Sequence, residues 1–231
     1  MEPSRLWTLV GFLLCFVQYL FAQSLPAGGL RTPDQLELHN VKAESVTYLG
    51  HTALRITDIG SSDVGDAERL AVVRESSFQD GTIEVDLTGD TAPNAPPELR
   101  GFVGIAFRVS SAGSQFECFY LRPKNGRSND QLQRNHSTQY ISTPGFPWNK
   151  LRSESPGKYE SYVDLVPGQW THVKIQVSGK TARLYVNGAQ QPTLLVNDLK
   201  QSESKGQIAL WIGTGTIAHF SRLTVSEPQV R

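Results

Sequence analysis

Apolar and polar side chains alternate with a two-residue period along most of the sequence, and this alternation limits the chain to β-structure. In residues 82–87 (TIEVDL), aliphatic side chains occupy every second position, with Glu84 and Asp86 between them. No stretch after residue 23 shows a convincing helical period. Alternating strands are typical of antiparallel sheets, because the strands of a parallel α/β sheet are apolar on both faces.

Turn residues divide the alternating sequence into short strands. Gly, Pro and Asn separate the apolar runs, for example at Pro167-Gly168 and Asn187-Gly188. Strands are predicted over residues 44–49, 53–57, 69–74, 82–87, 102–109, 116–122, 162–166, 170–177, 182–187, 207–212 and 218–225, with a short one near 138–142. About ten strands with short turns predict one all-β domain, a two-sheet antiparallel jelly-roll sandwich with one long ordered loop.

The N-terminal 22 residues have the features of a signal peptide. Arg5 supplies a positive charge, the run from Leu9 to Tyr19 is almost wholly apolar, and Ala22 offers a small residue for cleavage before Gln23. The run is shorter than the roughly 20 apolar residues of a membrane helix. We therefore expect an exported protein, secreted or periplasmic, without a membrane span after cleavage. Its predicted parts are the signal peptide 1–22, an N-terminal extension 23–41, the sandwich 42–226 and a tail 227–231.

Charge and residue content narrow the range of partners. The chain has 22 Lys and Arg against 22 Asp and Glu, so it lacks the basic excess that binds nucleic acid or an anionic membrane surface. Its five histidines show no HxH or HExxH spacing, and no transition-metal site is predicted. No cofactor is predicted, although calcium held by backbone carbonyls and an aspartate would leave no motif and stays open.

One long segment departs from the strand pattern. Residues 125–140 (NGRSNDQLQRNHSTQY) contain a single aliphatic residue, and residues 122–158 contain seven Lys and Arg against two Asp and Glu. Loops longer than about 12–15 residues inside a compact domain are either functional or disordered. This segment carries aromatic residues, including Tyr140 and Trp148, and its backbone is restricted by Pro144, Pro147 and Pro156. We therefore expect an ordered loop packed over one sheet face.

The composition of this loop favours a carbohydrate site. Sugars have a weakly apolar ring face, on which an aromatic ring stacks, and hydroxyls that pair with amide, carboxylate and guanidinium groups. The excess of arginine also suits acidic groups such as uronate or sulfate. The candidate residues are Arg122, Arg127, Asp130, Gln131, Arg134, Asn135, His136, Tyr140, Trp148 and Arg152. The alternative is that these side chains satisfy one another and the polar backbone of the loop.

Three segments carry a family resemblance. Residues 167–188 (PGQWTHVKIQVSGKTARLYVNG) resemble the closing hairpin of laminin G-like and concanavalin A-like sandwiches. Residues 206–225 (GQIALWIGTGTIAHFSRLTV), and the pair FVGIAFRV and FECFYLRP, are similar to strands of secreted bacterial domains of the 3-keto-disaccharide hydrolase type. The resemblance implies a jelly-roll sandwich that binds glycans on its concave sheet or rim loops. It implies no particular activity, because fold does not fix function.

Two classes of function are consistent with these patterns, and a protein-contact sandwich without a glycan stays open. The first is an exported lectin-like domain that binds an oligo- or polysaccharide without catalysis. The second is a glycoside-processing hydrolase of the 3-keto-disaccharide hydrolase type, with Glu117 as acid or base and either His136 or an arginine as its helper. Arg108 is expected to share a face with Glu117. The ExDxE arrangement of retaining glycanases is absent from the sequence, which favours the first class.

Overall fold

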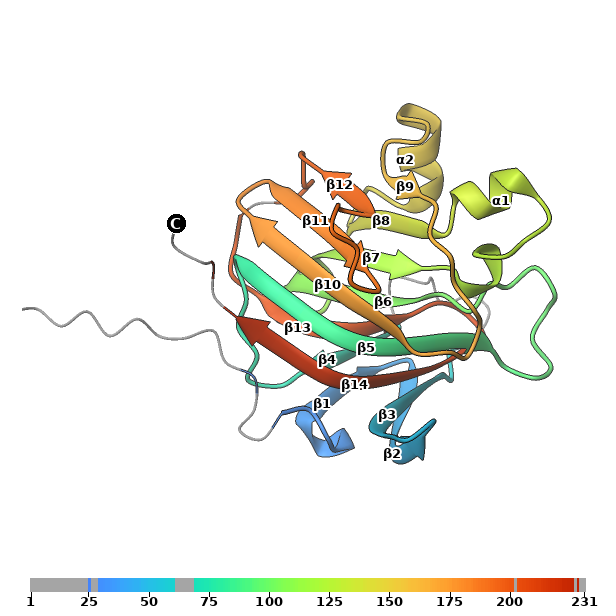
Figure 1. The fold of residues 1–231 in the computed structure, drawn as a ribbon. Coiled ribbons are helices and arrows are strands. Elements are labelled where there is room, and N and C mark those ends of the chain that lie inside the picture. Colours follow the sequence, from blue (N-terminus) through green and yellow to red (C-terminus); the bar gives the residue numbers. More distant parts are fainter. Residues whose placement is uncertain (1–24, 26–28, 61–68, 202, 227, 229–231) are drawn as a thin grey trace, which may run out of the picture.

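The described residues form two antiparallel sheets of seven strands each, where the sequence predicts two sheets with about ten strands in total. The computed structural model describes residues 25, 29–60, 69–201, 203–226 and 228. The predicted signal peptide 1–22 and all but Pro228 of the predicted tail lie outside the described residues. Figure 1 shows the two sheets lying face to face, with two short helices at one side. The predicted two-sheet jelly-roll sandwich is confirmed.

Each sheet combines strands that are distant in sequence. The first, here called sheet I, has the order β1 (Leu36–His39), β4 (Leu70–Val73), β13 (Gln207–Ile212), β6 (Val103–Val109), β7 (Phe116–Leu121), β8 (Thr138–Thr143) and β9 (Glu160–Ser161). The second, sheet II, has the order β12 (Leu194–Val196), β11 (Thr181–Val186), β10 (Thr171–Ser178), β5 (Gly81–Thr91), β14 (Thr216–Ser226), β3 (His51–Asp58) and β2 (Val41–Tyr48). The helices are α1 (Gln131–Asn135) and α2 (Trp148–Glu154), with short 3-10 turns at Pro33–Gln35 and Pro123–Asn125.

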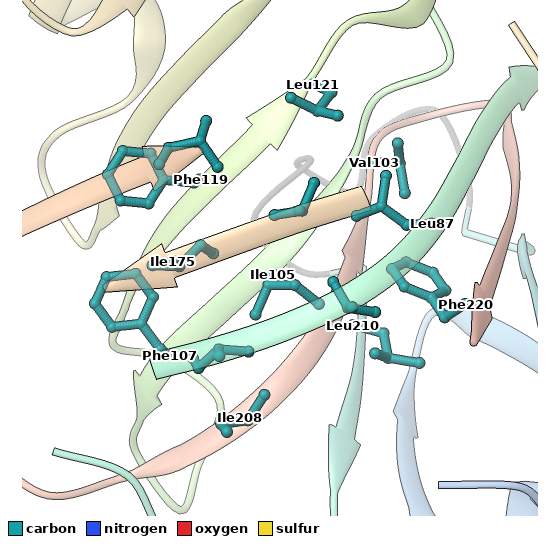
Figure 2. Packing of buried hydrophobic residues seen from close by; sticks show 14 of the residues in the cluster. Leu87, Val103, Ile105, Phe107, Phe119, Leu121, Ile175, Ile208, Leu210 and Phe220 are labelled. Atoms are coloured by element: carbon teal, nitrogen blue, oxygen red, sulfur yellow. The ribbon is translucent and has the colours of Figure 1, made fainter. Parts of the chain in front are cut away.

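The alternating residues of both sheets meet in the main core. In β5 and β10, Ile83 lies opposite Ile175 and Val85 opposite Val173, so the aliphatic positions of neighbouring strands share one face. These side chains are buried together with Phe107 and other residues of sheet I (Figure 2). Burial of this apolar surface between the sheets is the main stabilising contribution, at about 25 cal/mol per Å².

A second apolar cluster lies on the outer face of sheet I. Cys118, Tyr120 and Trp211 are buried there, and the rings of Tyr120 and Trp211 lie 4.7 Å apart. Phe102 packs against the same cluster. Burial raises the pKa of the Cys118 thiol well above its ordinary value, so the thiol stays protonated and serves in packing. Arg122, which follows β7, lies over the rings of Phe102 and Tyr120 at one end of this cluster.

The structure differs from the predicted strands in several places. Residues 162–166 form no ladder; Val163 and Leu165 pack against the core from a coil, which explains their alternation. Strand β1 lies within the predicted extension, and β12 has only three residues, too few for a clear pattern. The expected long loop contains two short helices, α1 and α2, and two strands of sheet I: β8, predicted near 138–142, and the two-residue edge strand β9.

Candidate functional site

The polar segment gathers at the β8 edge of sheet I. Figure 1 shows α1, α2 and β9 together beside β8, which pairs with β7 along its whole length. Asp130 begins α1, because its carboxylate accepts hydrogen bonds from the backbone of Leu132 at 2.8 Å and of Gln133 at 3.3 Å. Helix α2 follows Pro147 and exposes Trp148 at its first position. The two helices thereby carry side chains over the β8–β9 edge.

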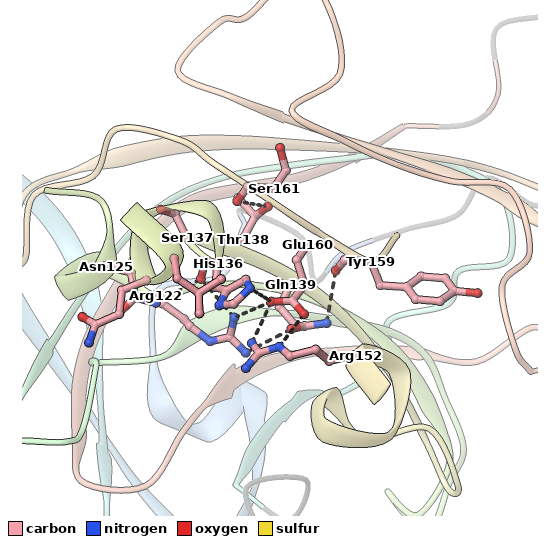
Figure 3. A network of polar contacts seen from close by, with 12 residues as sticks. Arg122, Asn125, His136, Ser137, Thr138, Gln139, Arg152, Tyr159, Glu160 and Ser161 are labelled. Atoms are coloured by element: carbon pink, nitrogen blue, oxygen red, sulfur yellow. Dashed lines mark hydrogen bonds and ion pairs between the residues drawn. The ribbon is translucent and has the colours of Figure 1, made fainter. Parts of the chain in front are cut away.

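Glu160 is the centre of this region, and the sequence alone did not single it out. Its side chain is 2% exposed, and Arg152 donates to it through Nε and Nη2, both at 2.7 Å. His136 Nε2 lies 3.3 Å and Arg122 Nη1 3.7 Å from the same carboxylate (Figure 3). A buried carboxylate requires such partners, because an unpaired buried charge is strongly unfavourable.

Arg122 is a buried cation whose guanidinium donates three hydrogen bonds to protein oxygens. Its guanidinium donates to the His136 carbonyl at 3.0 Å, to Tyr120 Oη at 2.8 Å and to Gln139 Oε1 at 3.0 Å. Its Cζ also lies 5.0 Å from the centroid of the Tyr120 ring and 5.9 Å from that of Trp148. Arg122 therefore joins β7, β8 and α2, and it places a positive charge beneath Trp148.

A pocket of about 410 Å³, here called the Trp148 pocket, opens above this cation. Trp148 is 40% exposed, and the Cζ of Arg152 lies 4.7 Å from the centroid of its ring. The lining residues are Arg100, Phe102, Arg122, Asn125, Gln133, His136, Trp148 and Arg152. These described residues include three arginines and no carboxylate, so the pocket has a positive potential.

A second pocket of about 600 Å³, the Tyr162 pocket, shares His136 and Arg152 with the first. Its other lining residues are Leu132, Asn135, Pro156, Gly157, Glu160, Ser161 and Tyr162. Leu132, Tyr162 and Trp148 are three of the seven exposed large hydrophobic residues in the described part of the chain. Apolar side chains thus gather around two adjoining polar pockets, an arrangement typical of ligand sites.

His136 stands between the two pockets as a neutral side chain. Burial lowers the pKa of its imidazole, Arg152 and Arg122 lower it further, and Glu160 opposes them. Because the net change is downward from 6.5, the imidazole is uncharged at neutral pH. The charge of the site at pH 7 therefore comes from its arginines and from Glu160.

Two candidates from the sequence lie in the interior of the sandwich. Tyr140 is buried; its hydroxyl donates to Glu117 at 2.6 Å and accepts from the backbone of Lys200 at 2.9 Å. Burial raises the pKa of this phenol, and the nearby Glu117 carboxylate raises it further. The ring of Tyr140 packs against Phe119 and Tyr159 in the core, where a sugar has no access to it.

Glu117 is also fully buried, at 0% exposure, and its second oxygen accepts from the backbone of Gln201 at 2.8 Å. It lines neither pocket, whereas His136 lines both, so the structure does not join them into a catalytic pair. Arg108, which was expected to share a face with Glu117, forms no ion pair with it in the described structure. Phe107 is the residue opposite Glu117, and Arg108 instead pairs with Asp80 at 2.9 Å.

Four other candidates line neither pocket, and each forms hydrogen bonds or ion pairs with neighbouring groups. Arg127 forms a two-point ion pair with Asp164 at 2.7 and 2.8 Å. Asp130 caps α1, and Gln131 donates to Asn135 Oδ1 at 2.8 Å. Arg134, in α1, donates from its guanidinium to the Tyr162 hydroxyl at 3.0 Å. These four side chains therefore fit the alternative that the polar groups of the loop satisfy one another. Asn135, by contrast, lines the Tyr162 pocket.

Several pocket residues are not among the candidates from the sequence. Arg100 and Phe102 precede β6, and Asn125 lies in the turn after β7, so only the tertiary fold brings them beside α2. Within the described ranges, no group of three or more His, Cys, Asp or Glu side chains is placed to hold a metal ion. In the same ranges, no helix is long and apolar enough to cross a membrane.

The fold and the rim pockets together define a concanavalin A-like β-sandwich with a polar, aromatic-lined site. A family model described as the concanavalin A-like lectin/glucanases superfamily matches residues 103–224, and the chain belongs to this superfamily. The resemblance of the sequence to concanavalin A-like sandwiches is thus confirmed. No curated protein matches the chain.

Several solved structures are similar to this chain at low sequence identity. A protein of unknown function with a galectin-like fold from Bacillus subtilis superposes with a TM-score of 0.51 and 13% identity, over 90% of this chain and 95% of that one. The carbohydrate-binding module CBM66 from Bacillus subtilis gives a TM-score of 0.48 and 15% identity, over 83% and 98%. A Bacillus licheniformis β-glucanase gives 0.47 and 12%, over 83% and 87%. At 13% identity, the likeness to the galectin-like protein shows the fold alone.

Proposed function

We propose that this protein is an exported, lectin-like carbohydrate-binding domain without catalysis, and that the two adjoining pockets hold successive residues of an oligo- or polysaccharide. The observation that carries the proposal is the exposed ring of Trp148 among guanidinium and amide groups. An indole ring stacks on the apolar face of a sugar, and the polar groups beside it pair with hydroxyls.

The two pockets suit a chain of sugars better than a small isolated ligand. His136 and Arg152 line both, so a ligand that fills the Trp148 pocket extends directly into the Tyr162 pocket. The second pocket offers the exposed Tyr162 ring and the amide of Asn135. Each pocket therefore combines an aromatic side chain with polar partners, which is the combination that a sugar residue needs.

The carboxylate content supports binding rather than hydrolysis. Glycosidases of most families use two carboxyl groups that flank the scissile bond. Of the described residues that line the pockets, Glu160 alone carries a carboxylate, and Arg152 occupies both of its oxygens. Glu117, the other candidate acid, is buried in the interior. A bound glycan is accordingly expected to be released unchanged.

Binding of the purified protein to a glycan array tests this proposal. Trp148→Ala is expected to abolish binding to any glycan captured, with an unchanged far-UV circular dichroism spectrum. Leu195→Ala removes another exposed hydrophobic residue, on β12 of sheet II, and is expected to bind like the wild type. Capture of no glycan, or full binding by Trp148→Ala, would refute the assignment. Release of shortened products from a captured glycan would instead favour the hydrolase.

Export is the second part of the proposal and is tested separately. It rests on the N-terminal segment, with Arg5 before the apolar run and Ala22 at its end. N-terminal sequencing of the protein recovered outside the cytoplasm is expected to begin at Gln23. Recovery of the intact N-terminus in the cytoplasm would remove export from the proposal without affecting glycan binding.

A further inference from the structure

The arginines of the Trp148 pocket are not equally available to a ligand. Arg122 is 4% exposed and donates to three protein oxygens. Arg152 uses Nε and Nη2 for Glu160, and no hydrogen bond in the described structure uses its Nη1. Arg100 donates through Nη1 to the carbonyls of Pro97 and Leu99, which leaves its Nη2 for a ligand. Two guanidinium groups thus present donors to the pocket, above a third that contributes charge.

Asn125 adds a hydrogen-bond acceptor without a donor. Its Nδ2 donates to the His136 carbonyl at 3.1 Å, which fixes the orientation of the amide. Its Oδ1 is buried and has no partner in the described structure, although the residue, 5% exposed, lines the Trp148 pocket. A buried acceptor without a partner costs about 1–3 kcal/mol, so a ligand hydroxyl that donates to it would be favoured.

These features specify more than a generic sugar. With a neutral sugar in the pocket, Arg100 would have no counter-charge among the described residues, and Arg122 and Arg152 would share the single carboxylate of Glu160. Inorganic sulfate would balance the charge but would offer no donor to Asn125. An acidic sugar residue satisfies all of these side chains. Its anionic group can pair with Arg100 and Arg152, a hydroxyl can donate to Asn125, and its apolar ring face can stack on Trp148. Guanidinium pairs strongly with carboxylate and with sulfate oxygens.

We propose, building on the carbohydrate-binding function, that the Trp148 pocket selects an acidic sugar residue, with its anionic group at Arg100 and Arg152 and a hydroxyl at Asn125. The Tyr162 pocket then holds a neutral neighbour. Its one cation, Arg152, is already paired with Glu160, and that carboxylate would repel a second acidic group. The site therefore fixes the register of a polysaccharide in which an acidic residue adjoins a neutral one.

Matched glycan pairs test this selection by isothermal titration calorimetry. Oligogalacturonate is compared with its carboxyl-reduced form, and heparin oligosaccharides with their desulfated forms, together with neutral glycans from the array. At least one acidic member is expected to bind ten-fold or more tightly than its neutral counterpart, and the pair that differs identifies carboxylate or sulfate as the group recognised. If a neutral glycan binds and no acidic member has an advantage, the selection is refuted while carbohydrate binding stands. If no glycan of either kind binds, both proposals fail.

Variants place the anionic group. Arg100→Gln is expected to reduce the advantage of the acidic member to less than three-fold, because the contacts of this guanidinium are to backbone carbonyls and the fold does not depend on it. Arg100→Lys is expected to keep part of the advantage. Arg183→Gln on β11 removes an arginine from sheet II and is expected to change nothing. An undiminished advantage in Arg100→Gln would refute the placement, and so would an undiminished advantage in Asn125→Asp, which adds a negative charge to the pocket that holds the anionic group.

Discussion

Arg152 and Glu160 form a two-point ion pair that joins α2 to β9, with both nitrogen–oxygen distances at 2.7 Å. The geometry is the parallel pairing of a planar guanidinium with a planar carboxylate, which is stronger and more directional than a single contact. Because Glu160 is buried and Arg152 stacks on the ring of Trp148, the pair determines where that ring stands. The position of the Trp148 ring thus depends on Glu160, which lines the Tyr162 pocket.

Removal of one partner of this pair is expected to destabilise the protein. Arg152→Ala leaves the buried Glu160 with the more distant Arg122 at 3.7 Å and the neutral His136. We expect a loss of about 2–4 kcal/mol in the free energy of unfolding, somewhat less than for a fully buried pair because Arg152 is partly exposed. Urea unfolding at pH 7 measures the loss.

Arg127→Ala is the matched control for this prediction. Arg127 also forms a two-point ion pair, with Asp164, but both side chains are exposed. Solvent-exposed pairs contribute little to stability, so Arg127→Ala is expected to unfold like the wild type. Equal midpoints for Arg152→Ala and the wild type would contradict the role given to the buried pair.

The strands were largely predictable because alternation has a direct structural cause. In β5 and β10 every second residue faces the core, and the register Ile83–Ile175 places these residues on the same side. The same signal was misleading at residues 162–166, where Val163 and Leu165 contact the core without joining a ladder. Alternation reports which side chains face the core; it does not report whether the backbone has a pairing partner.

The site was predictable only in part, for a different reason. Arg122, His136, Trp148 and Arg152 were expected in the site and do line the Trp148 pocket. Tyr140 was expected with them, but it lies on the inner face of β8, and composition cannot distinguish an aromatic residue that faces the core from one that faces solvent. Glu160 in β9 and Asn125 after β7 were not expected in the site, because only the tertiary fold brings their segments together.

Tyr140→Phe is expected to separate stability from binding. The variant keeps the ring in the core but removes one of the two donors to the buried Glu117. We expect a loss of about 1–3 kcal/mol in unfolding free energy, the cost of an unsatisfied buried carboxylate oxygen. Glycan affinity of the folded protein is expected to stay unchanged, because Tyr140 lines neither pocket. Unchanged urea stability together with reduced glycan affinity would return Tyr140 to the site.

Gly104→Ala is expected to disturb sheet I beneath the site. Gly104 lies between Tyr120 and Trp211 in the strand register, and the rings of these two residues meet 4.7 Å apart. A Cβ at position 104 would clash with the carbonyl oxygen of Phe119, which is backbone and cannot rotate away. We expect a loss of about 2–3 kcal/mol in unfolding free energy, measured by urea unfolding. Wild-type stability would show that β6 and β7 can separate at little cost.

His219 is expected to make the protein less stable in mild acid. Its ring stacks on Tyr48 at 3.7 Å and its Nδ1 lies 3.1 Å from Thr88 Oγ1; burial, aided by Arg55, lowers the pKa of the imidazole to about 4. In the unfolded chain the same group takes up a proton near pH 6.5, so the unfolded state binds more protons between these two values.

The stabilisation linked to His219 is therefore complete above pH 6.5 and is lost as the pH falls toward 4. The loss is at most about 3 kcal/mol, because a ten-fold change in proton affinity corresponds to about 1.4 kcal/mol and solvent screening reduces the effect. His219→Gln cannot take up the proton, so its unfolding free energy is expected to change less between pH 7 and pH 4.5 than that of the wild type. His172→Gln, at an exposed imidazole of the same sheet, is the control and is expected to keep most of the wild-type pH dependence. If His219→Gln and the wild type lose equal stability over this range, then the stacked imidazole is not the group that couples folding to protons.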